Sequence, residues 1–114
     1  SAVLIYGVPD APLSQPRNVI MGHILSAATG VTVFMLFGLT WWSPAIGTAL
    51  ALVVMILTKT THPPGGATAL FAVLSKAHPI YIFNPIALGA VILIIIGLIV
   101  NNISPNRQYP KYWY

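Results

Sequence analysis

Long uncharged apolar segments restrict the fold of this chain more than any other feature. The stretch from Asn18 to Trp42 and the stretch from Asn84 to Asn101 contain no charged residue. A hydrocarbon core about 30 Å thick is crossed by about 20 apolar helical residues, so each stretch is long enough to span a bilayer. We therefore expect an all-α fold, a polytopic bundle of transmembrane helices with broken or half helices.

The composition supports a membrane location and excludes several other classes of protein. Charged residues make up 5% of the chain, against roughly 25% in a soluble domain. There is no cysteine, which excludes a disulfide-stapled secreted scaffold. The basic residues lie apart at the edges of apolar segments, whereas a nucleic-acid-binding protein gathers them on one face. They are Arg17, Lys59, Lys76, Arg107 and Lys111. We expect contact with the lipid bilayer and an anion, and no nucleic-acid partner.

The region between the long spans contains a short apolar segment and then a broken one. Pro44–Thr58 contains no charged residue but is short for a membrane span. In Thr60–Leu74 the prolines predict an extended start over His62-Pro63, followed by a short helix from Gly65-Gly66. Such a segment either crosses the membrane or turns back within it, and its extended half must be buried in protein or line a wet cavity.

A weak internal repeat supports the idea of broken elements. A shift of 67 residues aligns Ser1–Val3 with Thr68–Leu70, Gly22 with Gly89, and Gly30 with Gly97. Each unit then holds a short broken element and a long helix, and an odd number of crossings per unit makes the repeats inverted, as in many transporters. Chance similarity is an equal alternative in a composition this rich in small apolar residues. We treat residues 1–114 as a single transmembrane domain that lacks one N-terminal helix.

The basic residues favour the topology in which Thr60–Leu74 crosses the membrane. If it crosses, Lys76 lies alone on one side and the other four basic residues share the cytoplasmic or stromal side, as the positive-inside rule prefers. If it turns back, the basic residues divide three to two. The polar and aromatic tail from Ser104 to Tyr114 is expected to lie at the membrane interface.

The broken segment carries the residues best suited to bind an anion. A helix that starts at Gly65-Gly66 leaves its first backbone N–H groups without helical partners, and its dipole favours negative charge there. We predict that Gly65, Gly66 and Ala67 donate N–H groups to a substrate anion, while His62 and Thr68 line the site. The alternative is that this Pro-Pro-Gly-Gly motif is only a loop between helices.

Several other polar residues are candidates for the same pathway. We predict that Lys59 adds positive charge to the substrate site and, with Arg17, attracts anions to its mouth. Asn18 and His23 are predicted to line the pathway. The alternatives are that Lys59 only extends its side chain to the interface and that His23 makes an interhelical hydrogen bond. Asp10 is interpreted as structural, capping a turn or pairing with Arg17.

No constellation for hydrolysis or metal binding is present. The chain has a single acid, Asp10, and lacks cysteine, a Gly-x-Ser-x-Gly motif and the histidine spacing of a zinc site. We therefore expect no enzymatic activity, no bound metal and no cofactor.

Three motifs resemble those of one family of integral membrane proteins. The segment His62–Leu70 resembles the signature of the HPP family, and Pro9–Asn18 resembles its second motif. Asn101-Asn102 together with Arg107–Trp113 resembles its C-terminal motif. The resemblance covers nearly the whole chain and implies a compact helical membrane domain. Members of the family usually carry a further N-terminal hydrophobic helix, which this sequence does not show.

The resemblance also implies a function. Plant and cyanobacterial members of the family are known as nitrite transporters, so it implies transport of a small inorganic anion, with nitrite the best single choice. It places the protein in the cell (inner) membrane of a bacterium or cyanobacterium, or in the chloroplast envelope of a plant. We expect a homo-oligomer, most simply a dimer, because so few spans rarely enclose a pathway. The alternative is a non-transporting membrane module that assembles with or regulates a partner protein.

Overall fold

The computed structural model describes residues 1–114 and confirms the all-α fold. Four α-helices are joined by short loops, and three shorter helical turns, two of π type and one of 3-10 type, complete the chain. In chain order the elements are η1 (Val3–Gly7), η2 (Pro12–Ser14), α1 (Pro16–Phe37), α2 (Ser43–Leu57), α3 (Pro64–Leu74), η3 (Ile82–Ala87) and α4 (Leu88–Ile103).

The two predicted long spans are present with shifted ends. The first helix, α1, starts at Pro16, where a proline is favourable, and ends at Phe37 because Gly38 takes a positive φ of 69°. Trp41, predicted to lie within this span, is outside the helix and 93% exposed. The second span covers Ile82–Ile103 as η3 and α4, with a kink at Asn84 before the inflexible Pro85. Both spans are long and apolar enough to cross a membrane.

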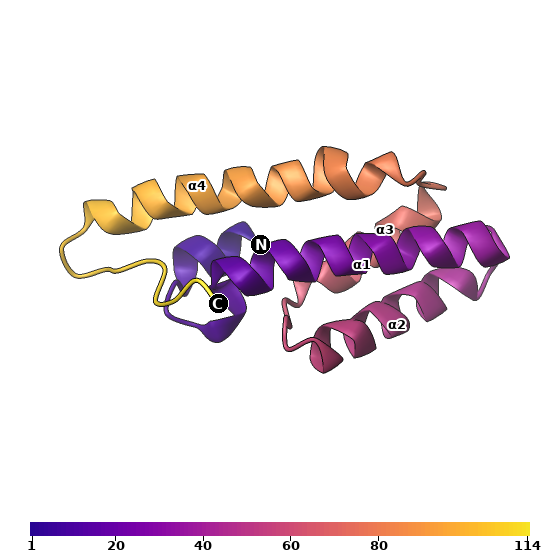
Figure 1. Ribbon diagram of the computed structural model, residues 1–114, viewed down its shortest axis with the longest axis horizontal. Helices are drawn as coiled ribbons and strands as arrows, with labels where there is room; N and C mark the ends of the chain where they lie inside the picture. Colours follow the sequence, from indigo (N-terminus) through magenta and orange to yellow (C-terminus); the bar gives the residue numbers. More distant parts are fainter.

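The helices α2 and α3 form a hairpin against α1. Figure 1 shows α2 running back along α1, after which α3 turns again and follows the direction of α1. An ideal Cβ atom at Gly65 of α3 would be 2.7 Å from Oγ of Ser26, and one at Gly30 would be 2.8 Å from Cβ of Ala72. The contacts advance together along both helices, so α1 and α3 are parallel. The chain leaves α3 toward the end of the molecule at which α1 finishes.

The basic residues fall into two groups along α1. Four of them lie at or beyond the start of α1, held by side-chain hydrogen bonds, an ion pair or their place after α2. These four are Arg17, Lys59, Arg107 and Lys111. Lys76 follows α3, next to Ala77, which packs against Val31 in the second half of α1. The Nζ of Lys111 lies 3.1 Å from Oδ1 of Asp10, so the alternative pairing of Asp10 with Arg17 does not form.

The C-terminal tail folds back against the start of the chain rather than lying free (Figure 1). Tyr109 is 2% exposed, and its hydroxyl donates a 2.8 Å hydrogen bond to the carbonyl of Ser14. The backbone N–H of Lys111 donates to Oε1 of Gln15 over 2.9 Å. The prediction of an interfacial tail is therefore wrong for Tyr109, because its ring packs inside the domain, whereas the last residues, through Tyr114, are exposed.

Candidate functional site

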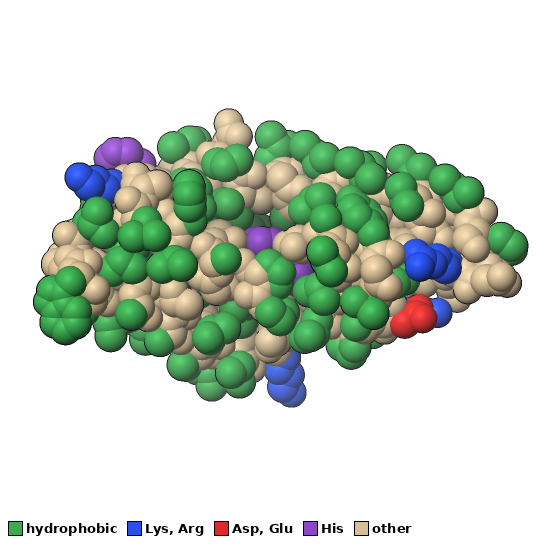
Figure 2. All heavy atoms as spheres, turned by 180° about the vertical axis from the view of Figure 1, so that it is seen from behind, with side chains coloured by type: hydrophobic (Ala, Val, Ile, Leu, Met, Phe, Trp, Pro, Cys, Tyr) green, Lys and Arg blue, Asp and Glu red, His purple; other side chains and the backbone are tan.

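Two histidines from different segments meet inside the domain. His62 lies in the extended segment between α2 and α3 and has no exposed surface, while His23 lies in α1 and is half-buried. Their ring centroids are 5.0 Å apart in an edge-to-face arrangement. Gly22 makes this approach possible, since a side chain there would overlap Cβ of His62. Figure 2 shows imidazole atoms in a hollow near the middle of a face otherwise covered mostly by hydrophobic side chains.

Hydroxyl groups connect the two imidazole rings into one chain of hydrogen bonds. Nδ1 of His23 lies 2.7 Å from Oγ1 of Thr68, and its Nε2 lies 2.6 Å from Oγ of Ser1. The same Ser1 oxygen lies 2.9 Å from Nε2 of His62. Nδ1 of His62 lies 2.8 Å from the carbonyl oxygen of Leu13. All four ring nitrogens of the histidine pair therefore have partners.

The carbonyl of Leu13 fixes the direction of the whole chain when both histidines are neutral. A carbonyl oxygen only accepts, so Nδ1 of His62 carries a proton and Nε2 of that ring accepts from the Ser1 hydroxyl. The Ser1 oxygen then accepts from Nε2–H of His23, whose Nδ1 accepts from the Thr68 hydroxyl. This assignment follows from the hydrogen-bond network. It gives one continuous chain of hydrogen bonds from Thr68 to the carbonyl of Leu13.

The start of α3 is closed by its own backbone. The positions that ordinarily present free N–H groups are occupied by Pro63 and Pro64, which have none, and by Gly65 and Gly66. The N–H of Gly65 donates to the carbonyl of His62 over 2.8 Å, and that of Gly66 donates to the carbonyl of Pro63 over 3.0 Å. Contrary to the prediction, neither glycine presents a free N–H. Pro63 is also helical (φ −51°, ψ −39°) rather than extended.

Lys59 has a structural role that its position after α2 explains. It adopts a positive φ of 56°, its N–H donates to the carbonyl of Ile56, and the next N–H, of Thr60, donates to the carbonyl of Met55. This is the Schellman arrangement that ends a helix, and Lys76 (φ 55°) ends α3 with the same pattern. Lys59 is exposed, and its side chain forms no hydrogen bond with either histidine.

Arg17 and Asn18 fasten the broken segment to the start of α1. The guanidinium of Arg17 donates to the carbonyls of Thr58 and Lys59, each over 3.1 Å. Nδ2 of Asn18 donates to the carbonyl of Thr61 over 2.9 Å. The structure thus brings His23, predicted as a pathway residue, together with His62 and Thr68, whereas Arg17 and Lys59 lie at the rim.

Comparison with known proteins places the chain in a family. Residues 1–110 match the transmembrane region of the HPP family. The chain belongs to the HPP transmembrane family. Two relatives of this HPP domain, both from Dictyostelium discoideum and both named as transmembrane proteins, are 44% and 43% identical to it over 122 aligned residues. The chain is covered fully by both alignments but spans only 39% and 43% of the length of these relatives. No solved structure matches the chain.

The structure adds two residues to the site of the HPP domain that motif analysis missed. Ser1 links the two imidazoles, and the signal that points to it is the 67-residue shift, which aligns Ser1 with Thr68. Ser26 is fully buried, and its hydroxyl is the one buried side-chain polar atom without a partner. It lies against the backbone of Gly65, where an ideal Cβ atom would be 2.7 Å from Oγ of Ser26.

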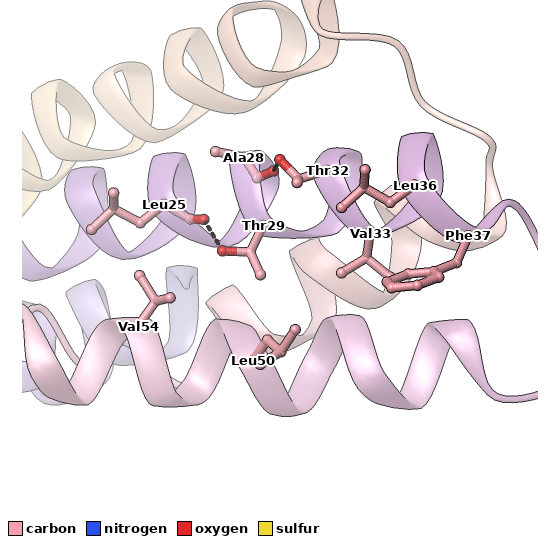
Figure 3. A pocket seen from close by; sticks show the side chains of 9 residues that line it. All are labelled: Leu25, Ala28, Thr29, Thr32, Val33, Leu36, Phe37, Leu50 and Val54. Carbon is pink, nitrogen blue, oxygen red and sulfur yellow. Dashed lines mark hydrogen bonds between the residues drawn. The ribbon is translucent and has the colours of Figure 1, made fainter.

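A separate groove between α1 and α2 is apolar and does not include the histidines. It has a volume of about 320 Å³, and seven of its nine lining residues are hydrophobic. In Figure 3 the hydroxyl of Thr29 points back to the carbonyl of Leu25, and that of Thr32 likewise donates to the carbonyl of Ala28. Because neither threonine offers a free donor, this surface of the HPP domain suits lipid chains rather than an anion.

Proposed function

We propose that this HPP domain transports a small inorganic anion across a membrane, with nitrite as the substrate that the family resemblance favours. The observation that carries the proposal is the polar cluster of the buried His62 and Thr68 with the half-buried His23 and Ser1, inside an otherwise apolar helical bundle. Polar residues are costly at membrane depth, and those that persist there commonly mark substrate or ion pathways.

The chemistry of the cluster suits a small anion that accepts hydrogen bonds. The hydroxyls of Ser1 and Thr68 and the N–H of His23 are donors that exchange their present partners for a ligand by small rotations. Removing an ion from water costs several kcal/mol, so a buried anion needs several such donors at once. His62 and Thr68 line the site in this proposal, and His23 and Asn18 lie along the route to it.

The remaining predicted ligands act at the edge of the site. Lys59 and Arg17 add positive charge near its mouth, on the side where α1 starts. Gly65, Gly66 and Ala67 contribute N–H groups only if the first turn of α3 opens, because the N–H groups of the two glycines are now bonded within the turn. We propose opening of this turn as the step that admits the anion.

The setting of the protein follows from the same proposal. We propose that it acts without enzymatic activity, in the cell membrane of a bacterium or cyanobacterium or in a chloroplast envelope, and as a homodimer. The dimer would enclose the pathway that so few helices cannot enclose alone. About 17% of the apolar stretch within Ile82–Ile103 is buried, which leaves surface for lipid or a second subunit.

Uptake by proteoliposomes tests the transport proposal. Purified wild-type protein is expected to take up nitrite faster than protein-free vesicles, and His62→Gln is expected to lower the rate at least tenfold. His78→Gln is the matched control, because His78 lies exposed in the loop after α3 and should leave uptake unchanged. Absence of nitrite uptake by the wild-type protein under any imposed ion gradient would refute the proposal.

One observation favours a second candidate function. The closed start of α3 fits a module that uses its glycines for packing and assembles with or regulates a partner protein instead of transporting. Such a module shows no nitrite flux even when inserted and folded. It also shows no change in the NMR resonances of His23 and His62 when nitrite is added.

A further inference from the structure

The side chains of the histidine cluster carry no permanent charge. The guanidinium of Arg17 is bound to carbonyls at the rim, and Lys59 is exposed. The single acid, Asp10, pairs with Lys111 at the surface, 3.1 Å away. An anion beside His23 and His62 therefore meets no side chain with a fixed positive charge.

Uncompensated charge at membrane depth is costly, so the site needs a mobile positive charge. The groups that face the cluster from each packed element are few. The extended segment contributes His62, α1 contributes His23, and α3 contributes Thr68, whose carbonyl accepts from the Tyr81 hydroxyl over 3.5 Å. Ser1 contributes its hydroxyl and its amino group, and α2 contributes the uncharged Met55, whose Sδ lies beside Gly22 and Gly65. Among these side chains only imidazole has a neutral form that becomes positively charged on binding a proton.

We propose that His23 and His62 together take up one proton with each anion, so that the protein is a proton–anion symporter. This inference rests on the proposed transport function and adds the coupling ion to it. The cluster is neutral when empty and carries one positive charge when loaded, and the anion cancels that charge. The loaded site as a whole is then electroneutral.

The hydrogen-bond chain shows how the proton is shared. A proton added at Nδ1 of His23 makes its ring an imidazolium, and the Thr68 hydroxyl turns to accept from it. The Nε2 proton of His23 then passes to Oγ of Ser1 as the Ser1 proton passes to Nε2 of His62. The result is a neutral His23 and an imidazolium at His62, which still donates to Leu13. One proton is gained, only N–H and O–H bonds change, and no heavy atom moves far.

The internal repeat accounts for the position of His23, the residue at which the proton is added. Ser1 and Thr68 are equivalent positions under the 67-residue shift, and they bind the two opposite nitrogens of the same ring. The corresponding position in the second repeat is Ala90, so a single imidazole serves both units. In inverted repeats the two units exchange roles between the two open states. In this structure His23 contacts one hydroxyl from each unit.

Flux measurements under controlled gradients test the coupling. An inward proton gradient is expected to drive nitrite into proteoliposomes and to acidify the lumen by one proton per nitrite, after subtraction of the nitrous acid flux in protein-free vesicles. A membrane potential set with valinomycin and potassium should leave the wild-type rate unchanged. Nitrite flux that follows the potential and carries no proton would overturn the symport proposal while leaving transport itself established.

Two variants test the relay separately from folding. His23→Gln keeps a polar side chain of similar size but cannot bind a proton, and it is expected to lower proton-driven uptake at least tenfold. Ser1→Ala removes the link between the rings while the bond between His62 and Leu13 persists, and it should lower the proton-to-nitrite ratio. Wild-type behaviour of Ser1→Ala in both rate and ratio contradicts the relay. The number of protons that the wild-type protein carries per nitrite tests the coupling even if His23→Gln fails to fold.

Discussion

Ile5 lies so close to Gly97 that an ideal Cβ atom at position 97 would be 2.5 Å from Cγ2 of Ile5. Gly30 faces Ala72 in the same way, at 2.8 Å from Cβ. The 67-residue shift that relates Gly30 to Gly97 also relates Ile5 to Ala72, so the weak sequence repeat is matched by a repeated contact. The long helices of the two units run in opposite directions (Figure 1), as inverted repeats require.

The contact between Ile5 and Gly97 predicts a stability difference between two glycines of α4. Gly97→Ala is expected to destabilise the domain by about 1–3 kcal/mol, since the added methyl overlaps Ile5. Gly89→Ala is the control: no atom lies within 4 Å of that position, and alanine favours a helix over glycine by about 1 kcal/mol. Thermal unfolding in detergent, followed by circular dichroism, compares them. Equal stability of the two variants contradicts the packing described.

The two glycines at the start of α3 are predicted to differ from each other. A methyl at Gly65 meets Oγ of Ser26 at 2.7 Å, Sδ of Met55 at 2.9 Å and the carbonyl of Gly22 at 3.0 Å, so Gly65→Ala should cost about 1–3 kcal/mol. A methyl at Gly66 has its nearest neighbours at 3.7 Å, so Gly66→Ala should keep wild-type stability. The same unfolding assay measures both. A strong loss of stability in Gly66→Ala would show that this turn packs differently.

The lysines that end α2 and α3 are predicted to gain stability on replacement by glycine. Lys59 and Lys76 hold left-handed backbone angles that cost a residue with a side chain about 1 kcal/mol, so Lys59→Gly and Lys76→Gly should each stabilise the domain by up to that amount. Nitrite uptake at low ionic strength separates them further. If Lys59 attracts anions, Lys59→Gly raises KM while Lys76→Gly leaves it unchanged.

The buried phenol of Tyr109 predicts that the domain loses stability at alkaline pH. Burial raises the pKa of its phenol above the usual value of 10, with a smaller contribution from Tyr6. The folded state therefore favours the neutral phenol, and its stabilising effect is complete below pH 10 and lost as the pH rises above it. Tyr109→Phe should lose about 1 kcal/mol at neutral pH with the bond to Ser14, but should lose less further stability above pH 10. Tyr114→Phe is the exposed control and should behave as wild type.

Local patterns predicted the elements better than their contacts. The non-helical segment at His62 follows from the prolines after it, and the end of α2 follows from the hydropathy pattern. Both signals depend on only a few neighbouring residues. The closed first turn of α3 did not follow, although it is local, because the rule for free N–H groups describes helices whose first turn is not tightened by bonds three residues back. Pro63 belongs to that turn, since its carbonyl accepts a hydrogen bond from the N–H of Gly66.

The sequence by itself determined that this is an all-helical membrane protein of the HPP family, because apolar length and long motifs are properties of the linear chain. It also identified His23, His62 and Thr68 as candidate residues of the substrate site and its pathway. Only the tertiary structure decided that these three meet at Ser1, since the four residues come from four segments whose distances depend on how closely the helices approach. Small residues at Gly22 and Gly30 set that approach, and no hydropathy pattern encodes which side chains they bring together.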